Sequence, residues 1–273
     1  MSTSSQAAER VSGSSFYSGM RILPPAQREA MYEIYSFCRA VDDIADDLGP
    51  RDGRRAALDQ WRADLSALYA GSPPPQLAGL AQAVRAFDLE HGDFLAVITG
   101  MEMDVVADIR APDRTTLDLY CDRVACAVGR LSVRVFGMEH EAGLALAHHL
   151  GRALQLTNIL RDLDEDAGLG RLYLPREALR DAGIISTDPT EVMINPMLGE
   201  ACGTIVALAQ EEFARARQIM AKAQRRVVRA PRIMGEAYHL ILQGLIARGF
   251  APPRPRVRLP KARFLFIVVR NFF

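Results

Sequence analysis

The chain has 273 residues, of which 49% are hydrophobic and 24% charged, and its formal net charge at pH 7 is zero. This is the composition of a globular protein with a sizeable core, and the neutral charge indicates no nucleic-acid partner. Neither a signal peptide nor a membrane span is predicted, because the first residues lack an apolar segment and no apolar run approaches the roughly 18 residues that a span needs.

The four cysteines belong to no CxxC pair and to no histidine-rich cluster. They are Cys38, Cys121, Cys126 and Cys202. We therefore expect reduced core thiols in a cytoplasmic protein, and neither disulfides nor zinc ligands.

The predicted helices are separated by clusters of Gly, Pro and Asp. Breaks are expected at 49–53, 71–75, 111–113, 137–140, 168–175 and 187–196. Between them apolar residues recur at spacings of three and four, whereas the alternating pattern of strands is scarce. We expect about seven or eight helices in an all-α fold, with one domain over residues 1–273 and its core at about 12–250.

The stretch CRAVDDIADD, residues 38–47, holds four aspartates within six positions. Residues 28–48 are predicted to be helical, and at about 100° per residue one apolar stripe forms a core-facing seam. The seam consists of Met31, Ile34, Cys38, Val41, Ala45 and Leu48. A second stripe directly beside it consists of Tyr35, Arg39, Asp42 and Asp46. Asp43 and Asp47 rotate further outward.

Asp42 and Asp46 border the seam, whereas a solvated face would lie opposite it. Side chains at this spacing have Cβ atoms about 5–6 Å apart, so the two carboxylates repel each other unless a cation lies between them. Mg²⁺ suits this position because it binds carboxylate oxygens, keeps waters and accepts phosphate oxygens. Acids four residues apart are common on helix surfaces, however, so this motif alone leaves a charged helix end as an alternative.

A second acidic ladder occurs at residues 151–167, GRALQLTNILRDLDEDA. Gln155, Asn158, Asp162 and Asp166 share one face of the predicted helix. Leucine and isoleucine fill its other faces, which indicates a buried helix whose acids need partners. A buried polar network is the alternative. If the two ladders face each other across a bundle, they form an acidic pocket that binds an anion only with divalent metal, such as a metal-chelated diphosphate.

The last residues, 251–273, form a basic tail with prolines and phenylalanines. No acidic residue follows Glu236, whereas the basic residues Arg248, Arg254, Arg256, Arg258, Lys261, Arg263 and Arg270 do. A basic segment with apolar anchors can lie on an anionic membrane surface, which here means a peripheral contact on the inner face of the membrane. The alternative is a tail that is solvated or packs on the body of the protein.

Four strings of the sequence resemble a known family. They are SFYSGMRILP, YSFCRAVDDIADD, YCDRVACAVG and LGRALQLTNILRDLDEDAGLGRLYLP. Together they resemble the squalene/phytoene synthases, which are head-to-head prenyl transferases, and the resemblance covers about residues 12–250. It implies a helical bundle of the isoprenoid synthase type with a central active-site cavity.

The resemblance also implies roles for individual residues. Asp42, Asp46, Asn158, Asp162 and Asp166 would hold three Mg²⁺ ions against two substrate diphosphates. Diphosphate-binding positions are matched by Arg39, Gln155, Arg161, Arg171 and Tyr173. Positions near the diphosphate or the reacting carbons are matched by Ser15, Phe16, Tyr35 and Tyr238, and the three aromatic rings among them could stabilise a carbocation. Some members carry His and Lys before the Ser-Phe pair, where this chain has Ser12 and Ser14, so diphosphate contacts from that segment are in doubt.

Within the family the strings are most similar to bacterial presqualene diphosphate synthases of hopanoid biosynthesis. This implies condensation of two farnesyl diphosphates without NADPH. The alternatives are a phytoene synthase that uses geranylgeranyl diphosphate and a squalene synthase with an NADPH-dependent second step. A non-catalytic helical bundle would have lost its acidic ladders, and both are complete here. The small residues of YCDRVACAVGRL, residues 120–131, could serve close helix packing or leave room for a prenyl chain.

Overall fold

The computed structural model describes residues 20–106 and 109–272, and these residues form an all-α protein. The elements are α3 (Pro25–Asp46), α4 (Arg51–Tyr69), η1 (Pro75–Leu77), α5 (Ala78–Phe87), α6 (His91–Val106), α7 (Arg114–Cys121), η2 (Asp122–Cys126), α8 (Ala127–Phe136), α9 (His140–Arg161), α10 (Leu163–Gly168), α11 (Arg176–Asp181), α12 (Pro189–Met193), α13 (Leu198–Lys222), α14 (Arg229–Arg248) and α15 (Lys261–Phe272). Within the described ranges the only isolated β-bridge joins Arg110 to Leu172. The all-α expectation is confirmed.

The expected breaks fall at helix ends, with one exception. The segment 187–196 contains the short helix α12, which begins at Pro189 behind the capping carboxylate of Asp188. Three further breaks were not expected, at 88–90, at Asp162 and at 223–228. The described part of the chain therefore has more helices than the sequence suggested.

Helix α3 shows why the first acidic stripe was placed correctly and where the prediction was wrong. The helix begins at Pro25, where the fixed φ of proline suits the first turn. Ile34, Val41 and Ala45 are at most 1% exposed, as expected of a core-facing seam. The helix ends at Asp46, however, and Leu48 is 91% exposed. Asp47 is already in extended conformation, so helical periodicity no longer decides which way Leu48 points.

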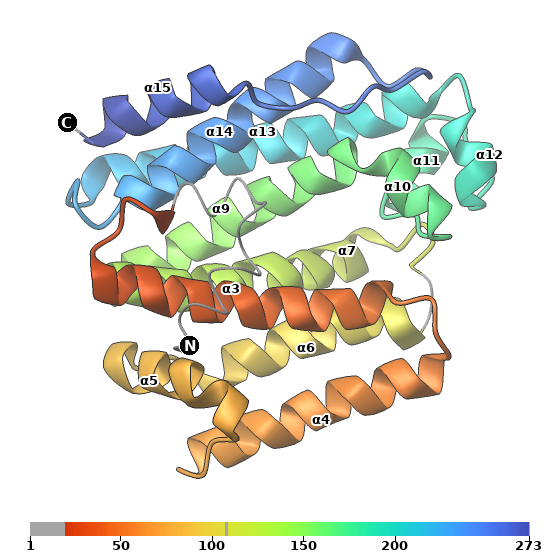
Figure 1. Ribbon diagram of the computed structural model, residues 1–273. Coiled ribbons are helices and arrows are strands. Elements are labelled where there is room, and N and C mark those ends of the chain that lie inside the picture. The colour runs from red at the N-terminus through yellow and green to blue at the C-terminus, as the bar shows by residue number, and fades with distance from the viewer. Residues whose placement is uncertain (1–19, 107–108, 273) are drawn as a thin grey trace.

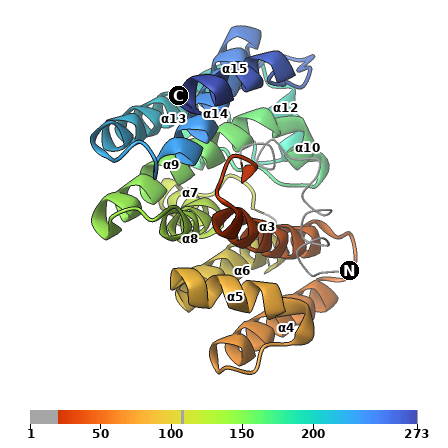
Figure 2. The same ribbon diagram turned by 60° about the vertical axis from the view of Figure 1, so that its left-hand side comes forward.

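The helices pack in layers around α3 and α9 (Figures 1 and 2). Helices α4, α5 and α6 lie on one side of α3, and α9, α13, α14 and α15 follow on the other side. The buried apolar side chains form two main clusters. One comes mainly from α3–α6 and α8, and the other mainly from α7, α9, α13 and α14. The cavity described below is lined by residues of both clusters, so it lies at the seam between them.

The small residues of η2 and α8 allow close packing against α9. A Cβ atom on Gly151 would lie 2.9 Å from the Cα of Cys126, and one on Gly129 would lie 3.1 Å from the Cα of Ala147. Gly129, Ala147 and Gly151 also line the cavity. Close helix packing is therefore confirmed, whereas room for a prenyl chain along this wall stays a prediction. The intervening η2 is a π-helix, a feature that is common at functional sites.

The basic tail packs on the body of the protein. The Arg254 guanidinium donates hydrogen bonds to Asp164 and to the carbonyls of Met193 and Phe250. Beyond it, α15 lies along α14, where Ile267 is 4% exposed. Searching the described residues for a helix that is both long and apolar enough to traverse a bilayer finds none.

Candidate active site

A cavity of about 1400 Å³ lies between α3, α8, α9 and α14, with α15 at its edge. It exceeds the roughly 300–1,000 Å³ of an ordinary ligand pocket, so it can hold more than one small molecule. Met31 and Ile34 of α3, Phe136 of α8 and Leu146 of α9 line one end. The other end is acidic, and there α3 and α9 both terminate. The partial negative charge of two helix C-termini adds to that of the carboxylates, so this end attracts cations.

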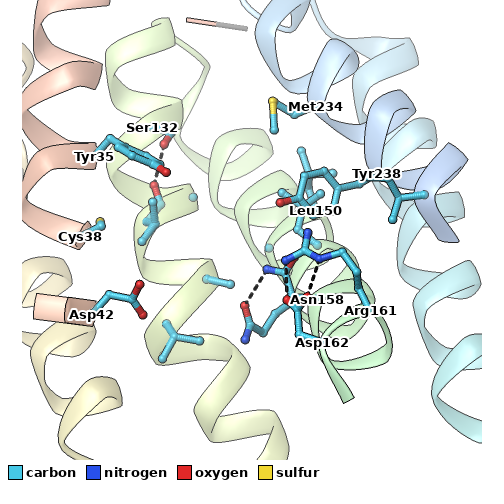
Figure 3. A pocket seen from close by; sticks show the side chains of 18 of the residues that line it. Tyr35, Cys38, Asp42, Ser132, Leu150, Asn158, Arg161, Asp162, Met234 and Tyr238 are labelled. Carbon is cyan, nitrogen blue, oxygen red and sulfur yellow. Dashed lines mark hydrogen bonds and ion pairs between the residues drawn. The ribbon is translucent and has the colours of Figure 1, made fainter. Parts of the chain in front are cut away.

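The first acidic ladder lines the wall formed by α3. Asp42 faces Asn158 and Asp162 across the cavity (Figure 3). The Arg39 guanidinium donates to Asp42 at 2.8 Å and to Asp43 at 2.7 Å, and Asp43 is 65% exposed. Asp47 lies outside the cavity lining and accepts a hydrogen bond from the backbone of Gly49. Burial, with a further contribution from Asp46, raises the pKa of Asp42 to about 6.

Asp46 is joined to the distant Arg171. The Arg171 guanidinium donates to the Asp46 carboxylate at 2.6 Å and to the carbonyl of Ala45 at 2.8 Å. This connects the end of α3 to the loop between α10 and α11. Asp46 and Arg171 both line the cavity, as their sequence assignment to the site requires.

The sequence suggested that the second ladder lies on one continuous helix, and this is wrong. Helix α9 ends at Arg161, Asp162 occupies the junction, and Asp166 belongs to α10. The ladder keeps its spacing because the Asp162 amide donates to the Asn158 carbonyl and the Asp166 amide donates to the Asp162 carbonyl, at 2.9 and 2.8 Å. Asn158, Asp162 and Asp166 all line the cavity, and so does Gln155.

The polar atoms of the second ladder are incompletely neutralised. Arg161 donates to Asp162 at 2.8 Å, and the Asn158 amide nitrogen lies 3.4 Å from the Gln155 oxygen. The Asn158 Oδ1 atom is buried and has no hydrogen-bond partner in the described part of the chain. Burial, followed by repulsion from Asp162, raises the pKa of Asp166 to about 8. A buried acceptor without a partner and a carboxylate with a raised pKa both call for a cation.

These residues fit Mg²⁺ delivered together with a phosphate ligand. No group of three His, Cys, Asp or Glu side chains within residues 20–106 and 109–272 is gathered closely enough to hold a metal alone. Mg²⁺ is usually bound by one or two carboxylates and by substrate phosphates, without a complete protein cage. The two ladders offer oxygen donors of this kind on opposite walls. Their present partners, Arg39, Arg161 and Arg171, are themselves phosphate-binding groups.

The crowded carboxylates predict a measurable gain in stability for Asp166→Asn without metal. Because the folded-state pKa of Asp166 is raised from 3.8 to about 8, its stability contribution is full below pH 4 and is lost as pH rises towards 8. Partial exposure reduces the effect. We therefore expect the free energy of unfolding of Asp166→Asn to exceed that of wild type by about 2 kcal/mol at pH 8 in EDTA. Urea denaturation between pH 5 and pH 8 measures this difference.

Asp164→Asn on the same helix is a control for which we expect the opposite change in the free energy of unfolding. Arg254 lowers the pKa of Asp164, so losing that carboxylate should lower the free energy of unfolding at pH 8. An equal or lower stability for Asp166→Asn at pH 8 would show that Asp166 is not strained by its surroundings.

Sequence reasoning missed a buried polar cluster at the acidic end of the cavity. The Asp104 carboxylate is 3% exposed and accepts hydrogen bonds from the hydroxyls of Tyr120 and Tyr173, at 3.1 and 2.8 Å. The two tyrosine rings stack with centroids 4.9 Å apart. Burial raises the pKa of Asp104 to about 6 against the lowering influence of Arg171. Asp104 lies between the apolar Met103 and Val105 in the last turn of α6, and this was the available signal, because an acid at a buried position needs partners.

The remaining predicted site residues divide into three groups. Tyr35 of α3 and Tyr238 of α14 line the cavity as expected, and Tyr238 is 6% exposed beside Arg161. Tyr173 lines it as well, but its hydroxyl is bound to Asp104. Ser15 and Phe16 lie outside the described residues.

The tail brings a further cation to the second ladder. Arg256 lies 3.4 Å from the Asp162 carboxylate and 3.3 Å from that of Glu165. About 90 residues of sequence separate Arg256 from these two acids, and no local pattern predicts a contact over such a separation. The acidic end therefore faces arginines from four separate segments, Arg39, Arg161, Arg171 and Arg256.

Comparisons with known proteins cover both ladders and the cavity. The sequence model of the family described as squalene/phytoene synthase matches residues 10–263. A presqualene diphosphate synthase of Rhodopseudomonas palustris is 60% identical over 258 residues, which cover 94% of this chain and 92% of the relative. A chloroplastic phytoene synthase of Narcissus pseudonarcissus is 39% identical over 63% of this chain and 42% of its own. Among solved structures, a squalene synthase of Alicyclobacillus acidocaldarius has a TM-score of 0.81 at 27% identity, covering 91% of this chain and 95% of that one.

Proposed function

Because the chain belongs to the squalene/phytoene synthase family, we propose that it joins two molecules of farnesyl diphosphate into presqualene diphosphate and inorganic diphosphate. Family and fold agree with the resemblance seen in the sequence, since the chain has the all-α isoprenoid synthase fold. One observation carries the proposal. Two acidic ladders face each other at one end of a cavity of about 1400 Å³ whose other end is apolar.

The choice of a C15 substrate is supported by the relatives. The presqualene diphosphate synthase of Rhodopseudomonas palustris is 60% identical to this chain, whereas the Narcissus phytoene synthase is 39% identical. We place the reaction in hopanoid or squalene biosynthesis, without a reductive second step and without NADPH.

Mg²⁺ is the cofactor that the donor set suits. Asp42 and Asp46 would hold it on one wall, and Asn158, Asp162 and Asp166 on the other, with three ions shared by two diphosphates. When bound, the metal supplies Lewis-acid neutralisation of the leaving diphosphate. The unpartnered Oδ1 of Asn158 supports this assignment, because a metal ion would satisfy it.

The arginines of the acidic end would exchange partners when substrate binds. In the structure Arg39, Arg161 and Arg171 pair with Asp42, Asp162 and Asp46, respectively. In the substrate complex these guanidinium groups would instead donate to phosphate oxygens, for which their planar geometry is suited. The site would therefore stay balanced in charge before and after binding.

The apolar end of the cavity would position the hydrocarbon chains and exclude water. The C–O bond of the first substrate breaks, and its electron pair leaves with the diphosphate. The double bond of the second substrate attacks the resulting allylic cation, and loss of a proton closes a cyclopropane ring. The ring faces of Tyr35 and Tyr238, which line the cavity, would stabilise the cation.

Product analysis tests the proposed function. We expect the purified protein with Mg²⁺ and farnesyl diphosphate, without reductant, to yield a C30 cyclopropyl diphosphate that mass spectrometry identifies. Removal of Mg²⁺ with EDTA should stop the reaction. Turnover of geranylgeranyl diphosphate alone would replace the proposal by a phytoene synthase. Formation of squalene only after addition of NADPH would replace it by a complete squalene synthase.

The hydrocarbon nature of substrate and product also bears on where the enzyme works. Both carry long prenyl chains that partition into membranes. We propose that the enzyme exchanges them at a membrane surface through its basic tail. This extends the proposed function and depends on it.

A further inference from the structure

Helix α15 is fixed to the body of the protein by one of its faces. Phe264, Ile267 and Val268 pack in an apolar cluster with Ile233 and Ala237 of α14. The Arg270 guanidinium forms an ion pair with Glu236 of α14 at 2.7 Å, and the Asn271 amide donates to the same carboxylate at 3.1 Å. The orientation of α15 about its own axis is therefore determined, and its opposite face is a defined surface.

That opposite face is apolar and exposed. Leu265, Phe266 and Val269 have 62%, 64% and 48% of their surface exposed, and Ala262 is exposed beside them. At about 100° per residue these four side chains occupy one continuous arc of about 100°. We call Ala262, Leu265, Phe266 and Val269 the outer stripe. Isolated exposed apolar residues are ordinary, but a continuous stripe of large ones on a folded helix indicates a binding surface.

Basic residues border the outer stripe on both sides. Lys261 lies at one edge, and Arg263 and Arg270 lie at the other. Lys261 and Arg263 have no ion-pair partner among residues 20–106 and 109–272, and the chain has no acidic residue after Glu236. An apolar stripe with cationic edges is the pattern of helices that lie in the interface of an anionic bilayer.

The outer stripe also meets the cavity. Lys261, Phe264 and Leu265 are among the residues that line it, although Leu265 is 62% exposed. The cavity therefore reaches the surface beside the outer stripe. A lipid surface in contact with this stripe would lie next to the opening through which a hydrocarbon chain can pass.

We propose that the outer stripe of α15 docks on an anionic lipid bilayer and turns this opening of the cavity towards the membrane. The proposal rests on the proposed function, which supplies the prenyl substrates. A second copy of the chain is the less favoured occupant. A symmetric contact through the same face would bring Lys261 and Arg263 of both copies together without acidic partners.

Vesicle flotation tests the proposal. Wild-type protein should bind vesicles of phosphatidylcholine with about one third phosphatidylglycerol and should not bind phosphatidylcholine alone. Phe266→Gln/Val269→Gln, which spares the cavity-lining Leu265, should bind at least tenfold more weakly. Arg263→Gln should bind about fivefold more weakly, as expected when one cation near an anionic surface is lost.

Two control variants carry the same chemical changes elsewhere. Ile185→Gln/Ile194→Gln replaces two residues that are 97% and 76% exposed. Arg55→Gln removes an exposed cation of α4. Both should bind vesicles like wild type. Turnover of farnesyl diphosphate in detergent solution should be equal in all variants, so failure of the proposed function would show as inactive wild type whatever the vesicle result.

Three results would overturn the proposal. One is that wild-type protein does not float with anionic vesicles. Another is that Phe266→Gln/Val269→Gln floats as well as wild type. The third is a concentration-dependent dimer in sedimentation velocity that this double variant abolishes, which would assign the outer stripe to a second copy of the chain.

Discussion

Asp42→Asn should lower kcat by about 10³-fold, whereas Asp43→Asn, one position along the same helix, should leave kcat within about threefold of wild type. Both carboxylates pair with Arg39, but their side chains point in different directions from the helix. Asp42 lines the cavity, and Asp43 is 65% exposed. Loss of one group that stabilises developing charge typically costs 10²–10³ in rate, and an amide oxygen is also a weaker ligand for Mg²⁺ than a carboxylate.

The experiment separates chemistry from folding. Asparagine keeps the size of aspartate and removes a carboxylate whose pKa is raised to about 6 by burial and by Asp46, so the variant should fold at least as stably as wild type. Diphosphate release and circular dichroism on both variants measure the two effects. The dependence of rate on Mg²⁺ concentration should shift to higher values in Asp42→Asn only. Turnover of Asp42→Asn within tenfold of wild type would refute the assignment of Asp42 to the metal site.

The acidic ladders could be predicted because each follows local periodicity. Asp42 and Asp46 are one turn apart beside a seam of buried residues, and their direction follows from the helix alone. The same rule was wrong at Leu48, where the helix has ended. It held for Asp162 and Asp166 although the helix changes there, since the backbone hydrogen bonds at Asn158 and Asp162 preserve the spacing.

Arg39 and Arg161 are neighbours of their acids in the sequence, but the pairing of two other arginines could not be predicted, because they come from distant segments. Arg171 reaches Asp46 across 125 positions and Arg256 reaches Asp162 across 94. Sequence separations of this size leave no periodic pattern from which a contact could be predicted. The cluster of Asp104 with Tyr120 and Tyr173 has the same character. Its members lie on α6, on α7 and in the loop before α11, and only tertiary packing brings them together.

Of the two alternatives for the tail, packing on the protein is confirmed, whereas membrane contact stays a prediction. Proline and arginine patterns gave no means of deciding between a tail packed on the protein and one facing a membrane. In the structure α15 is packed by Ile267 and exposed at Phe266, so one helix has both a bound and a free face. The face of α15 that packs on the protein is determined by Ile233 and Ala237 of α14. The sequence of the tail alone therefore does not show which face of α15 is buried.

Arg171→Met should lower the free energy of unfolding by about 3 kcal/mol at pH 8. The guanidinium is 8% exposed and joins Asp46, the Ala45 carbonyl and, at 4.0 Å, Asp104. Its removal leaves Asp104, which is 3% exposed, as a buried charge without a cationic partner, held only by the hydroxyls of Tyr120 and Tyr173. Removing one partner of a buried ion pair typically costs 3–5 kcal/mol. Arg180→Met, which removes an exposed charge of α11, should have little effect.

The pH dependence of this loss identifies its cause. Burial already raises the pKa of Asp104 to about 6, and Arg171 holds it down, so the variant should raise it further. A carboxylate with a raised folded-state pKa contributes stability that is lost as pH rises through that value. The deficit of Arg171→Met should therefore shrink at pH 5, where Asp104 takes up a proton, and Asp104→Asn in the same chain should restore much of the loss at pH 8. A deficit that is equal at pH 5 and pH 8 would place the cost in lost packing and remove Asp104 from the explanation.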